Sequence, residues 1–320
     1  MIRMFLSYLK LLISNFFYLL FSCYNLAIMF DNSSYDNIKN FVQSELNKID
    51  NFISCRENIS ADFDYSMAEY FSAPSKKIRS VLAILFFKAL GFDICDSFIK
   101  LLSAVEIIHN ATLIHDDVID KSDLRRGIET FNSKFDNSLA VIAGDYLLSR
   151  ALRLLLSLDN YNILNIFSDT IEKMCVGEIS QYFNKFKLLS IDDYIEKSRS
   201  KTAVLFCAAF ESASILYGFN RSLAFDFANN FGIAFQIRDD ILNFVEFENK
   251  PAANDYADGI YTAPVIFAEG NIENISIGIE KAKQLLDNYL CCCHNILAGI
   301  EFNDNIYKNA LLNLLELLKL

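Results

Sequence analysis

Apolar side chains recur every three or four residues along nearly the whole chain from Asn37 onward. Ile38, Val42, Leu46 and Ile49 begin this pattern, and the 320 residues contain only 3 prolines. Such spacing collects apolar side chains on one face of an α-helix. Runs that alternate apolar and polar residues, as strands do, are absent from the sequence. The pattern predicts an all-α fold.

The predicted helices form one large domain. They cover residues 80–90, 97–114, 138–158, 163–186, 190–217 and 225–247. Ser190 followed by Asp193 is typical of a capping box at a helix start, and Gly218 suits a helix end. The segment 250–264 is rich in turn-forming residues, but it is too short to link two domains. We therefore expect a single-domain helical bundle over residues 31–320.

The composition supports a large buried core and excludes two classes of protein. Hydrophobic residues make up 53% of the chain, far more than a disordered protein contains. The net charge of -11 argues against general nucleic-acid binding, which needs a basic surface. The 8 cysteines show no paired ligand spacing for zinc, and scattered thiols suit a reducing compartment such as the cytoplasm.

Residues 1–30 differ from the rest of the chain. Arg3 and Lys10 precede the nearly continuous apolar stretch 11–30, and residues 1–30 contain no acidic residue. About 20 apolar residues span a bilayer, and basic residues ahead of them are typical of a signal or anchor. Translation from Met29 would instead make the segment dispensable. Both interpretations stay open, and the first implies association with a membrane.

Three aspartates cluster at the end of the apolar helical segment 101–114. They are Asp116, Asp117 and Asp120. On a helix, Asp116 and Asp120 lie one turn apart on the same face, because residues i and i+4 are neighbours. No lysine or arginine separates them, so their charges repel. Magnesium relieves such repulsion, because it binds one or two carboxylates together with phosphate oxygens.

A second acidic pair, Asp239 and Asp240, lies about 120 residues later within another apolar segment. Asn243 occupies the i+4 position relative to Asp239. One such pair alone would be weak evidence, because acidic turns at helix ends are common. Two copies within apolar helices favour a shared metal site over two solvated surfaces.

Cationic side chains gather near these acidic clusters, although the chain as a whole is acidic. They are Lys76, Lys77, Arg79, Arg125, Arg126, Lys201 and Lys250. Guanidinium groups bind phosphate through two parallel hydrogen bonds, and lysine supplies a compact charge. Cations beside acidic clusters suit a polyphosphate that is bridged by metal ions.

The order and spacing of these motifs resemble those of the trans-isoprenyl diphosphate synthases. Residues 116–127 are similar to the first aspartate-rich motif of that family, and residues 235–243 are similar to the second. Further similar segments are 76–79, 143–148, 177–181, 201–203 and 250–255. The resemblance runs from about residue 32 to the C-terminus. It implies a helical bundle around a central cavity and, by analogy, a homodimer.

The resemblance also implies a reaction and a role for each motif. Isopentenyl diphosphate would condense with an allylic diphosphate such as farnesyl diphosphate, with three Mg²⁺ ions per active site. The metal ligands would be Asp116 and Asp120, assisted by Asp117, on one side and Asp239, together with Asp240, on the other; Lys201 would be a further catalytic residue. Isopentenyl diphosphate would be bound by Lys76, Arg79, His109 and Arg126. The allylic diphosphate would be bound by Arg125, Lys201, Thr202, Gln236 and Lys250. His115 is either a supporting residue or merely structural.

Two positions before the first motif bear on product length. In the family, large aromatic residues four and five places before the first aspartate give short products. Here Thr112 and Ala111 occupy these places, and both are small. The resemblance therefore implies a long all-trans polyprenyl diphosphate of the octaprenyl type, used for the side chain of a respiratory quinone. It also predicts that Ala111→Phe shortens the product.

The motifs depart from the family pattern at a few positions. Ser75, Lys77 and Ser80 replace the usual glycine, arginine and proline, and Asn243 replaces the last aspartate of the second motif. These changes bear on the rate more than on the type of reaction. Asn243 also keeps open a weakly active or regulatory subunit of a heteromeric synthase.

A class I terpene cyclase is the other alternative that the sequence leaves open. Cyclases share the fold and the first acidic motif, but their second motif ends in a glutamate. Counted from Asp239, that position holds Phe247. The sequence therefore favours the synthase over the cyclase.

Overall fold

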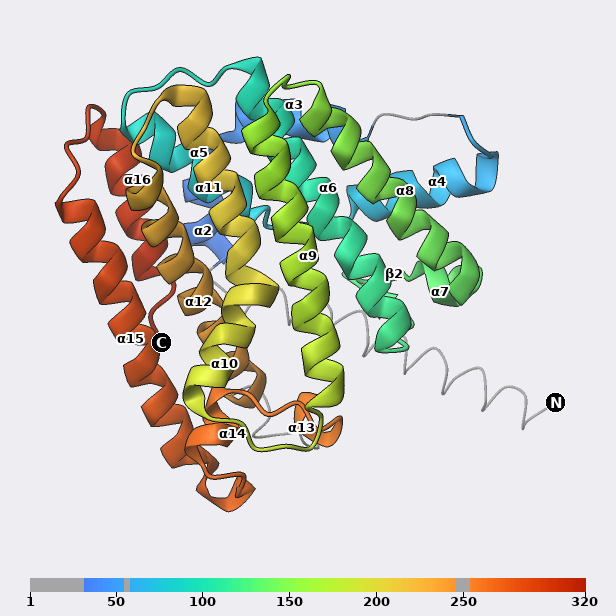
Figure 1. Cartoon of the computed structure of the whole chain (residues 1–320), viewed down its shortest axis with the longest axis vertical. Helices are drawn as coiled ribbons and strands as arrows, with labels where there is room; N and C mark the ends of the chain where they lie inside the picture. The colour runs from blue at the N-terminus through green and yellow to red at the C-terminus, as the bar shows by residue number, and fades with distance from the viewer. Residues whose placement is uncertain (1–31, 55–57, 246–253) are drawn as a thin grey trace.

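Helices make up nearly all of the secondary structure in the computed structural model of the chain (Figure 1). The structure describes residues 32–54, 58–245 and 254–320. The predicted leader or anchor at residues 1–30 and the predicted ligand Lys250 lie outside these ranges.

The elements follow one another along the chain with short connections. The first helices are α2 (Asn32–Asn40), α3 (Gln43–Ile53), α4 (Ala61–Ser72), α5 (Ile78–Ala89) and α6 (Asp96–Ile119). They are followed by the strands β1 (Leu124–Arg125) and β2 (Ile128–Glu129), and by α7 (Phe131–Lys134), α8 (Asn137–Leu156) and α9 (Tyr161–Phe183). Next come α10 (Ile191–Ser198), the π-helical turn η1 (Arg199–Ala203), α11 (Val204–Tyr217) and α12 (Arg221–Val245). The last are α13 (Asn254–Ala257), α14 (Ala263–Phe267), the 3₁₀ turn η3 (Ile272–Asn274), α15 (Ile275–Ala298) and α16 (Asn305–Glu316).

The long helices pack side by side around a core of apolar side chains. Helix α6 packs against α3, α8 and α11, and α12 packs against α11 and α15 (Figure 1). Phe86 of α5 meets Phe210 of α11 and Phe227 of α12, and all three are fully buried. Burying side chains of this size contributes about 1.5–3 kcal/mol each. This aromatic cluster holds the three helices together, and the predicted all-α fold is confirmed.

The predicted helices match the observed helices apart from their ends and from one interruption, the π-helical turn η1, which divides the helix expected over 190–217 into α10 and α11. Helix α10 begins with the predicted capping box, in which the Asp193 N–H donates to Ser190 Oγ at 3.1 Å. Gly218 ends α11 in the left-handed conformation, with a φ of 68°. Helix α6 continues beyond the predicted end at residue 114, so Asp116 and Asp117 lie on the helix itself.

A two-stranded hairpin, which the sequence pattern did not predict, follows the first acidic cluster. Arg125 of β1 pairs with Ile128 of β2 in antiparallel register. The turn residues Arg126 and Gly127 have positive φ values of 54° and 82°. This geometry is typical of a two-residue hairpin turn, in which glycine carries no steric penalty. Strands of two residues are too short to show a periodic pattern.

One described helix, α6, is long and apolar enough to cross a membrane by length and composition. Within its most apolar window, 72% of the residues are buried inside the protein. Such burial is typical of a core helix, which passes the same compositional test.

Candidate active site

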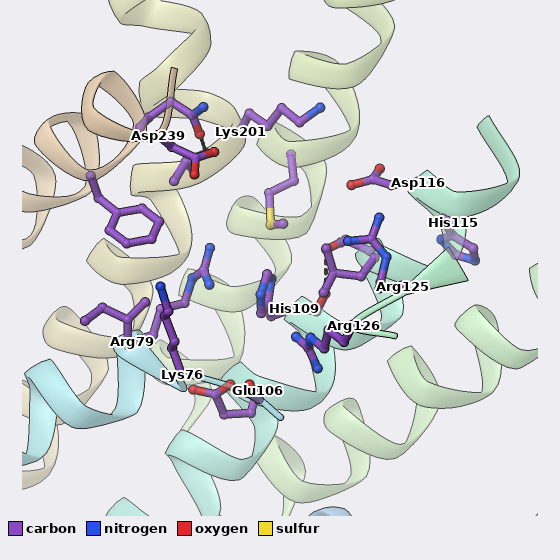
Figure 2. Close-up of a pocket in the computed structure, with 18 of the residues that line it drawn as sticks. Lys76, Arg79, Glu106, His109, His115, Asp116, Arg125, Arg126, Lys201 and Asp239 are labelled. Atoms are coloured by element: carbon purple, nitrogen blue, oxygen red, sulfur yellow. Dashed lines mark hydrogen bonds between the residues drawn. The ribbon is translucent and has the colours of Figure 1, made fainter. Parts of the chain in front are cut away.

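A cavity of about 1250 Å³ lies between the helices that carry the two acidic clusters. Its walls come from the start of α5, from α6, from the hairpin, and from α9, η1 and α12 (Figure 2). The predicted site residues that line it are Lys76, Arg79, His109, Thr112, Asp116, Arg125, Arg126, Lys201, Thr202, Gln236 and Asp239. Most of the predicted site therefore meets in one cavity.

Asp116 and Asp239 face this cavity from different helices (Figure 2). The pKa of Asp116 is raised to about 6, chiefly by burial; the cation of Lys201 opposes this shift, and the carboxylates of Glu178 and Asp120 add to it. The pKa of Asp120 is also raised, again chiefly by burial. A bound cation would favour the ionised form of both carboxylates.

Asp117 supports the hairpin and does not line the cavity. Its side chain is 2% exposed, and its Oδ1 accepts a hydrogen bond from Nε of Arg125 at 2.6 Å. Removing one partner of such a buried pair leaves an uncompensated charge. Asp117 therefore holds Arg125 at the cavity wall.

Glu178 of α9 lines the cavity and was not predicted as a site residue. Its Oε2 lies 2.7 Å from Nζ of Lys201, and its Oε1 accepts a hydrogen bond from Gln181 at 3.0 Å. Burial alone would lower the pKa of Lys201, but the carboxylates of Glu178, Asp116 and Asp120 outweigh burial and raise it. Lys201 therefore stays charged beside the acidic wall. The Gly-Glu-x-x-Gln motif in the sequence was the signal for this residue.

Cations surround His109 in another part of the cavity (Figure 2). Burial lowers the pKa of Arg79 to about 10, so this guanidinium remains charged, and it lies 4.8 Å from the centre of the Phe206 ring. Burial lowers the pKa of His109 well below its ordinary value, and the nearby arginines lower it further. The imidazole is therefore neutral at pH 7. Together with Lys76 and Arg126, these side chains form a site for an anion.

Lys77 and Ser80, which replace the arginine and proline usual in the family's first cationic motif, each have a defined partner. Ser80 Oγ donates to Oε1 of Glu106 at 2.6 Å, and this glutamate is 2% exposed. Lys77 precedes α5 with a positive φ of 50°, and its ammonium group pairs with Asp50 of α3. The charge of Lys77 is therefore already balanced, whereas Glu106 brings a negative charge to the cationic part of the cavity.

Asp240 lies behind the cavity wall. It is 3% exposed, and its carboxylate accepts hydrogen bonds from Tyr194 at 2.6 Å and from Gln236 at 2.8 Å. Gln236 in turn accepts a hydrogen bond from Thr202 at 2.6 Å. Gln236 and Thr202 line the cavity, so Asp240 is connected to it through them.

The two positions expected to limit product length differ in their surroundings. Thr112 lines the cavity, whereas Ala111 is fully buried and does not line it. A larger side chain at Thr112 would therefore enter the cavity directly, and one at Ala111 would first have to displace packed neighbours.

His115 packs against α8 at a point where only glycine fits. A Cβ atom on Gly144 would lie 2.1 Å from Nε2 of His115, and this nitrogen lies 3.2 Å from the carbonyl oxygen of Val141. Gly144 therefore lets α8 approach the helical turn that carries Asp116. His115 also lines the cavity, so both roles that the sequence leaves open, supporting and structural, stay open.

The donors in the cavity suit Mg²⁺ that is held jointly with phosphate. Within the described ranges, no group of three acidic, histidine or cysteine side chains forms a metal site by itself. Asp116 and Asp239 nevertheless face one cavity, and Mg²⁺ usually completes its ligands with water and phosphate oxygens. Asp116 and Asp239 would therefore suit Mg²⁺ that is held together with a phosphate-bearing ligand.

Comparison with known families agrees with this geometry. Residues 62–288 match the sequence model described as polyprenyl synthetase. The chain belongs to the polyprenyl synthetase family.

Individual relatives show how far the similarity extends. A prenyl transferase of Synechocystis sp. is 38% identical over 207 residues, which cover 62% of this chain and 64% of that protein. The match thus spans slightly less than two thirds of this relative. The octaprenyl diphosphate synthase of Haemophilus influenzae is 32% identical over 264 residues, which cover 79% of this chain and 80% of that protein.

A solved structure shows the same fold with a ligand bound. The polyprenyl synthase of Caulobacter crescentus, complexed with calcium and isoprenyl diphosphate, superimposes with a TM-score of 0.78 at 26% identity. The similarity covers 89% of this chain and 97% of that one.

Proposed function

We propose that this protein is a magnesium-dependent trans-prenyltransferase that extends an allylic diphosphate, such as farnesyl diphosphate, with isopentenyl diphosphate. The observation that carries the proposal is that Asp116 and Asp239 face one cavity that also contains Arg79, His109 and Arg126. The cavity thus offers one binding site for a metal-bound diphosphate and a second binding site for a diphosphate held by cationic side chains. The named activity of the Haemophilus influenzae relative supports a long-chain product.

The allylic diphosphate binds at the acidic wall of the cavity. Asp116, Asp120 and Asp239 would hold three Mg²⁺ ions, and bound Mg²⁺ supplies electrophilic stabilisation of the departing diphosphate. Arg125 and Lys201 line the cavity and donate charged hydrogen bonds to the same group. These donors favour the state in which negative charge accumulates on the diphosphate, as electrostatic catalysis requires.

Isopentenyl diphosphate binds among the cations around His109. As the allylic C–O bond breaks, both electrons leave with the diphosphate and an allylic cation remains. The isopentenyl double bond attacks this cation through its terminal CH₂ carbon, which forms one carbon–carbon bond and leaves a tertiary cation. The CH₂ group next to this tertiary cation then loses a proton, and the electrons of that C–H bond form the new double bond. We assign that proton to the released diphosphate by analogy with the family.

Incubation of the purified protein with Mg²⁺, farnesyl diphosphate and labelled isopentenyl diphosphate tests the proposal. We expect label in diphosphates longer than farnesyl diphosphate. A hydrocarbon formed from farnesyl diphosphate alone would identify a cyclase instead. Absence of turnover with every allylic primer tried would favour a weakly active or regulatory subunit of a heteromeric synthase.

Replacing Thr112 with phenylalanine is expected to shorten the products, because the ring would occupy the cavity through which the chain grows. Ala111→Phe is predicted to shorten them too, but with a loss of about 1–3 kcal/mol in the free energy of unfolding, because Ala111 is fully packed. Reversed-phase chromatography of the dephosphorylated products measures the lengths. Thr112→Ser is the matched control and should keep the wild-type lengths. Unchanged lengths in both phenylalanine variants would refute the proposal that these two positions limit product length.

We also propose a cytoplasmic homodimer that makes precursors of quinone side chains. Large apolar side chains that do not line the cavity are exposed on α8 and α9, including Ile142 at 61%, Leu156 at 59% and Val176 at 57%. Exposed apolar surface of this kind is typical of a protein interface. Light scattering after size exclusion would contradict the dimer if it gave the mass of one chain, 36.5 kDa.

Association with a membrane, through residues 1–30 or the product, would appear as protein in the pelleted membrane fraction.

A further inference from the structure

Four side chains form a continuous line of hydrogen bonds from the core to the cavity, which we call the Tyr194 network. The O–H of Tyr194, a fully buried residue of α10, donates to Oδ2 of Asp240 at 2.6 Å. Nε2 of Gln236 donates to Oδ1 of Asp240 at 2.8 Å, and Oγ1 of Thr202 donates to Oε1 of Gln236 at 2.6 Å. Gln236 and Thr202 line the cavity, whereas Tyr194 and Asp240 do not.

The network fixes which atoms of Gln236 and Thr202 face a ligand. A carboxylate only accepts hydrogen bonds, so Asp240 orients the Gln236 amide. The NH₂ group of the amide points toward Asp240, and its oxygen points toward Thr202. One N–H of that group is used by Asp240, and the other remains as a donor for a phosphate oxygen. The hydroxyl proton of Thr202 is committed to Gln236, so Thr202 does not itself donate to a phosphate oxygen. Its part is to hold the Gln236 amide and to tie η1 to α12.

The network ends on the π-helical turn η1, which carries both Lys201 and Thr202. Such turns are rare and occur frequently at functional sites. The turn packs directly on α12, because a Cβ atom on Gly232 would lie only 2.5 Å from Cα of Ala203. The hydrogen bond from Thr202 to Gln236 ties the same turn to α12 at the edge of the cavity.

We propose that Tyr194 and Asp240 are positioning residues for the allylic diphosphate. They hold Gln236 and Thr202, and through Thr202 the turn that carries Lys201, in the arrangement that receives the diphosphate. The identity of this ligand rests on the function proposed above. The role of Asp240 then differs from the one that the family resemblance implies, because it acts through its neighbours and binds no metal ion. Tyr194 becomes a member of the site although it never touches substrate.

A purely structural role is the competing explanation, since buried tyrosine–carboxylate hydrogen bonds also stabilise folds. Tyr194→Phe separates the two, because it removes one O–H donor and keeps the ring. We expect the KM for farnesyl diphosphate to rise about tenfold, the effect of one hydrogen bond to a charged group. The KM for isopentenyl diphosphate should change less than about twofold, because that substrate binds elsewhere in the cavity.

Tyr217→Phe is the matched control. Tyr217 of α11 donates to the backbone oxygen of Asp93 at 3.0 Å and does not line the cavity. This variant loses the same kind of group, and both KM values should stay at the wild-type level. Equal rises of both KM values in Tyr194→Phe, or a lower melting temperature with no change in either KM, would overturn the proposal.

Binding of inorganic pyrophosphate in the presence of Mg²⁺ gives a readout that needs no turnover. Calorimetry should show about tenfold weaker binding for Tyr194→Phe than for wild type. If the wild-type protein binds pyrophosphate but extends no allylic primer, the proposed function fails while this comparison still tests the network. Equal affinities in the two proteins would refute the network's role.

Asp240→Asn tests whether Asp240 binds metal, and it does so even if Tyr194→Phe does not fold. We expect the Mg²⁺ concentration that half-saturates pyrophosphate binding to stay within about twofold of wild type, because asparagine still accepts a hydrogen bond from Gln236. Asp239→Asn should raise that concentration at least about tenfold, because it removes a charged metal ligand. An equal increase in both variants would make Asp240 a metal ligand and overturn the proposal.

Discussion

Replacing Asp116 with asparagine is expected to lower kcat/KM on the order of 10³-fold and to raise the melting temperature of the metal-free protein. The loss of activity follows because Mg²⁺ stabilises the departing diphosphate by several kcal/mol and needs charged oxygen ligands. The gain in stability follows because burial of the ionised Asp116 carboxylate is unfavourable, and the nearby carboxylates of Glu178 and Asp120 repel it. Asparagine keeps the shape of the side chain and removes that charge.

The pKa of Asp116 gives this gain a definite pH dependence. It is about 6 in the folded protein, above its ordinary value of 3.8, so the folded state holds the proton more tightly than the unfolded state. The ionised carboxylate therefore destabilises the fold, fully above pH ~6 and not at all below pH ~4. The difference in melting temperature between Asp116→Asn and wild type should be largest at pH 8. It should disappear as the pH falls through this window.

Scanning calorimetry between pH 4 and 8, together with the labelled assay, measures both effects. Asp226→Asn is the matched control, because Asp226 is an exposed residue of α12 that does not line the cavity. It should change neither activity nor stability appreciably. Activity of Asp116→Asn within about tenfold of wild type would contradict its role as a metal ligand. A lower melting temperature at pH 8 would contradict the electrostatic argument.

Gly232→Ala is expected to reduce activity about a hundredfold and to destabilise the protein by about 1–3 kcal/mol. The added Cβ atom would lie 2.5 Å from Cα and 2.7 Å from Cβ of Ala203. Backbone atoms cannot rotate away, so α12 and η1 must separate. That movement shifts Lys201 and Thr202 relative to Asp239 and Gln236, across the site that binds the allylic diphosphate.

Gly299→Ala provides the control for this substitution. Gly299 follows α15 with a φ of -83°, and a Cβ atom there would meet no atom closer than 3.5 Å. The control should keep full activity. The KM for farnesyl diphosphate should rise in Gly232→Ala at a temperature where circular dichroism shows the variant to be folded. Wild-type kinetics in folded Gly232→Ala would show that the position of η1 does not matter for binding.

Local sequence patterns were sufficient to predict the helices and the first acidic cluster. The spacing of Asp116 and Asp120 places them on one face of any helix, and the apolar residues around them indicate a buried setting. The capping box at Ser190 and the stop at Gly218 were equally local, since each depends on a few neighbouring residues. The helices, the capping box and the stop are confirmed in the structure. Of the two aspartates, Asp116 lines the cavity, whereas Asp120 directly follows α6, is exposed and does not line it.

The features that could not be predicted depend on contacts between distant parts of the chain. Asp239 and Asp240 look equivalent in the sequence, but only the helix packing turns Asp239 to the cavity and Asp240 toward Tyr194. The pairing of Lys201 with Glu178 likewise joins η1 to α9. The hairpin that positions Arg125 is too short for any periodicity. No local pattern specifies such hydrogen bonds, because their partners lie on other elements.

The central claim is that α6 and α12 share one set of metal ions through a bound diphosphate. Crystals of the protein grown with Mn²⁺ and inorganic pyrophosphate test it most directly, because anomalous scattering locates each metal ion. We predict metal ions around a single pyrophosphate, with Asp116 and Asp120 as ligands on one side and Asp239 on the other. Metal ions confined to one of the two helices, or a pyrophosphate that leaves Asp239 without a metal, would contradict the account.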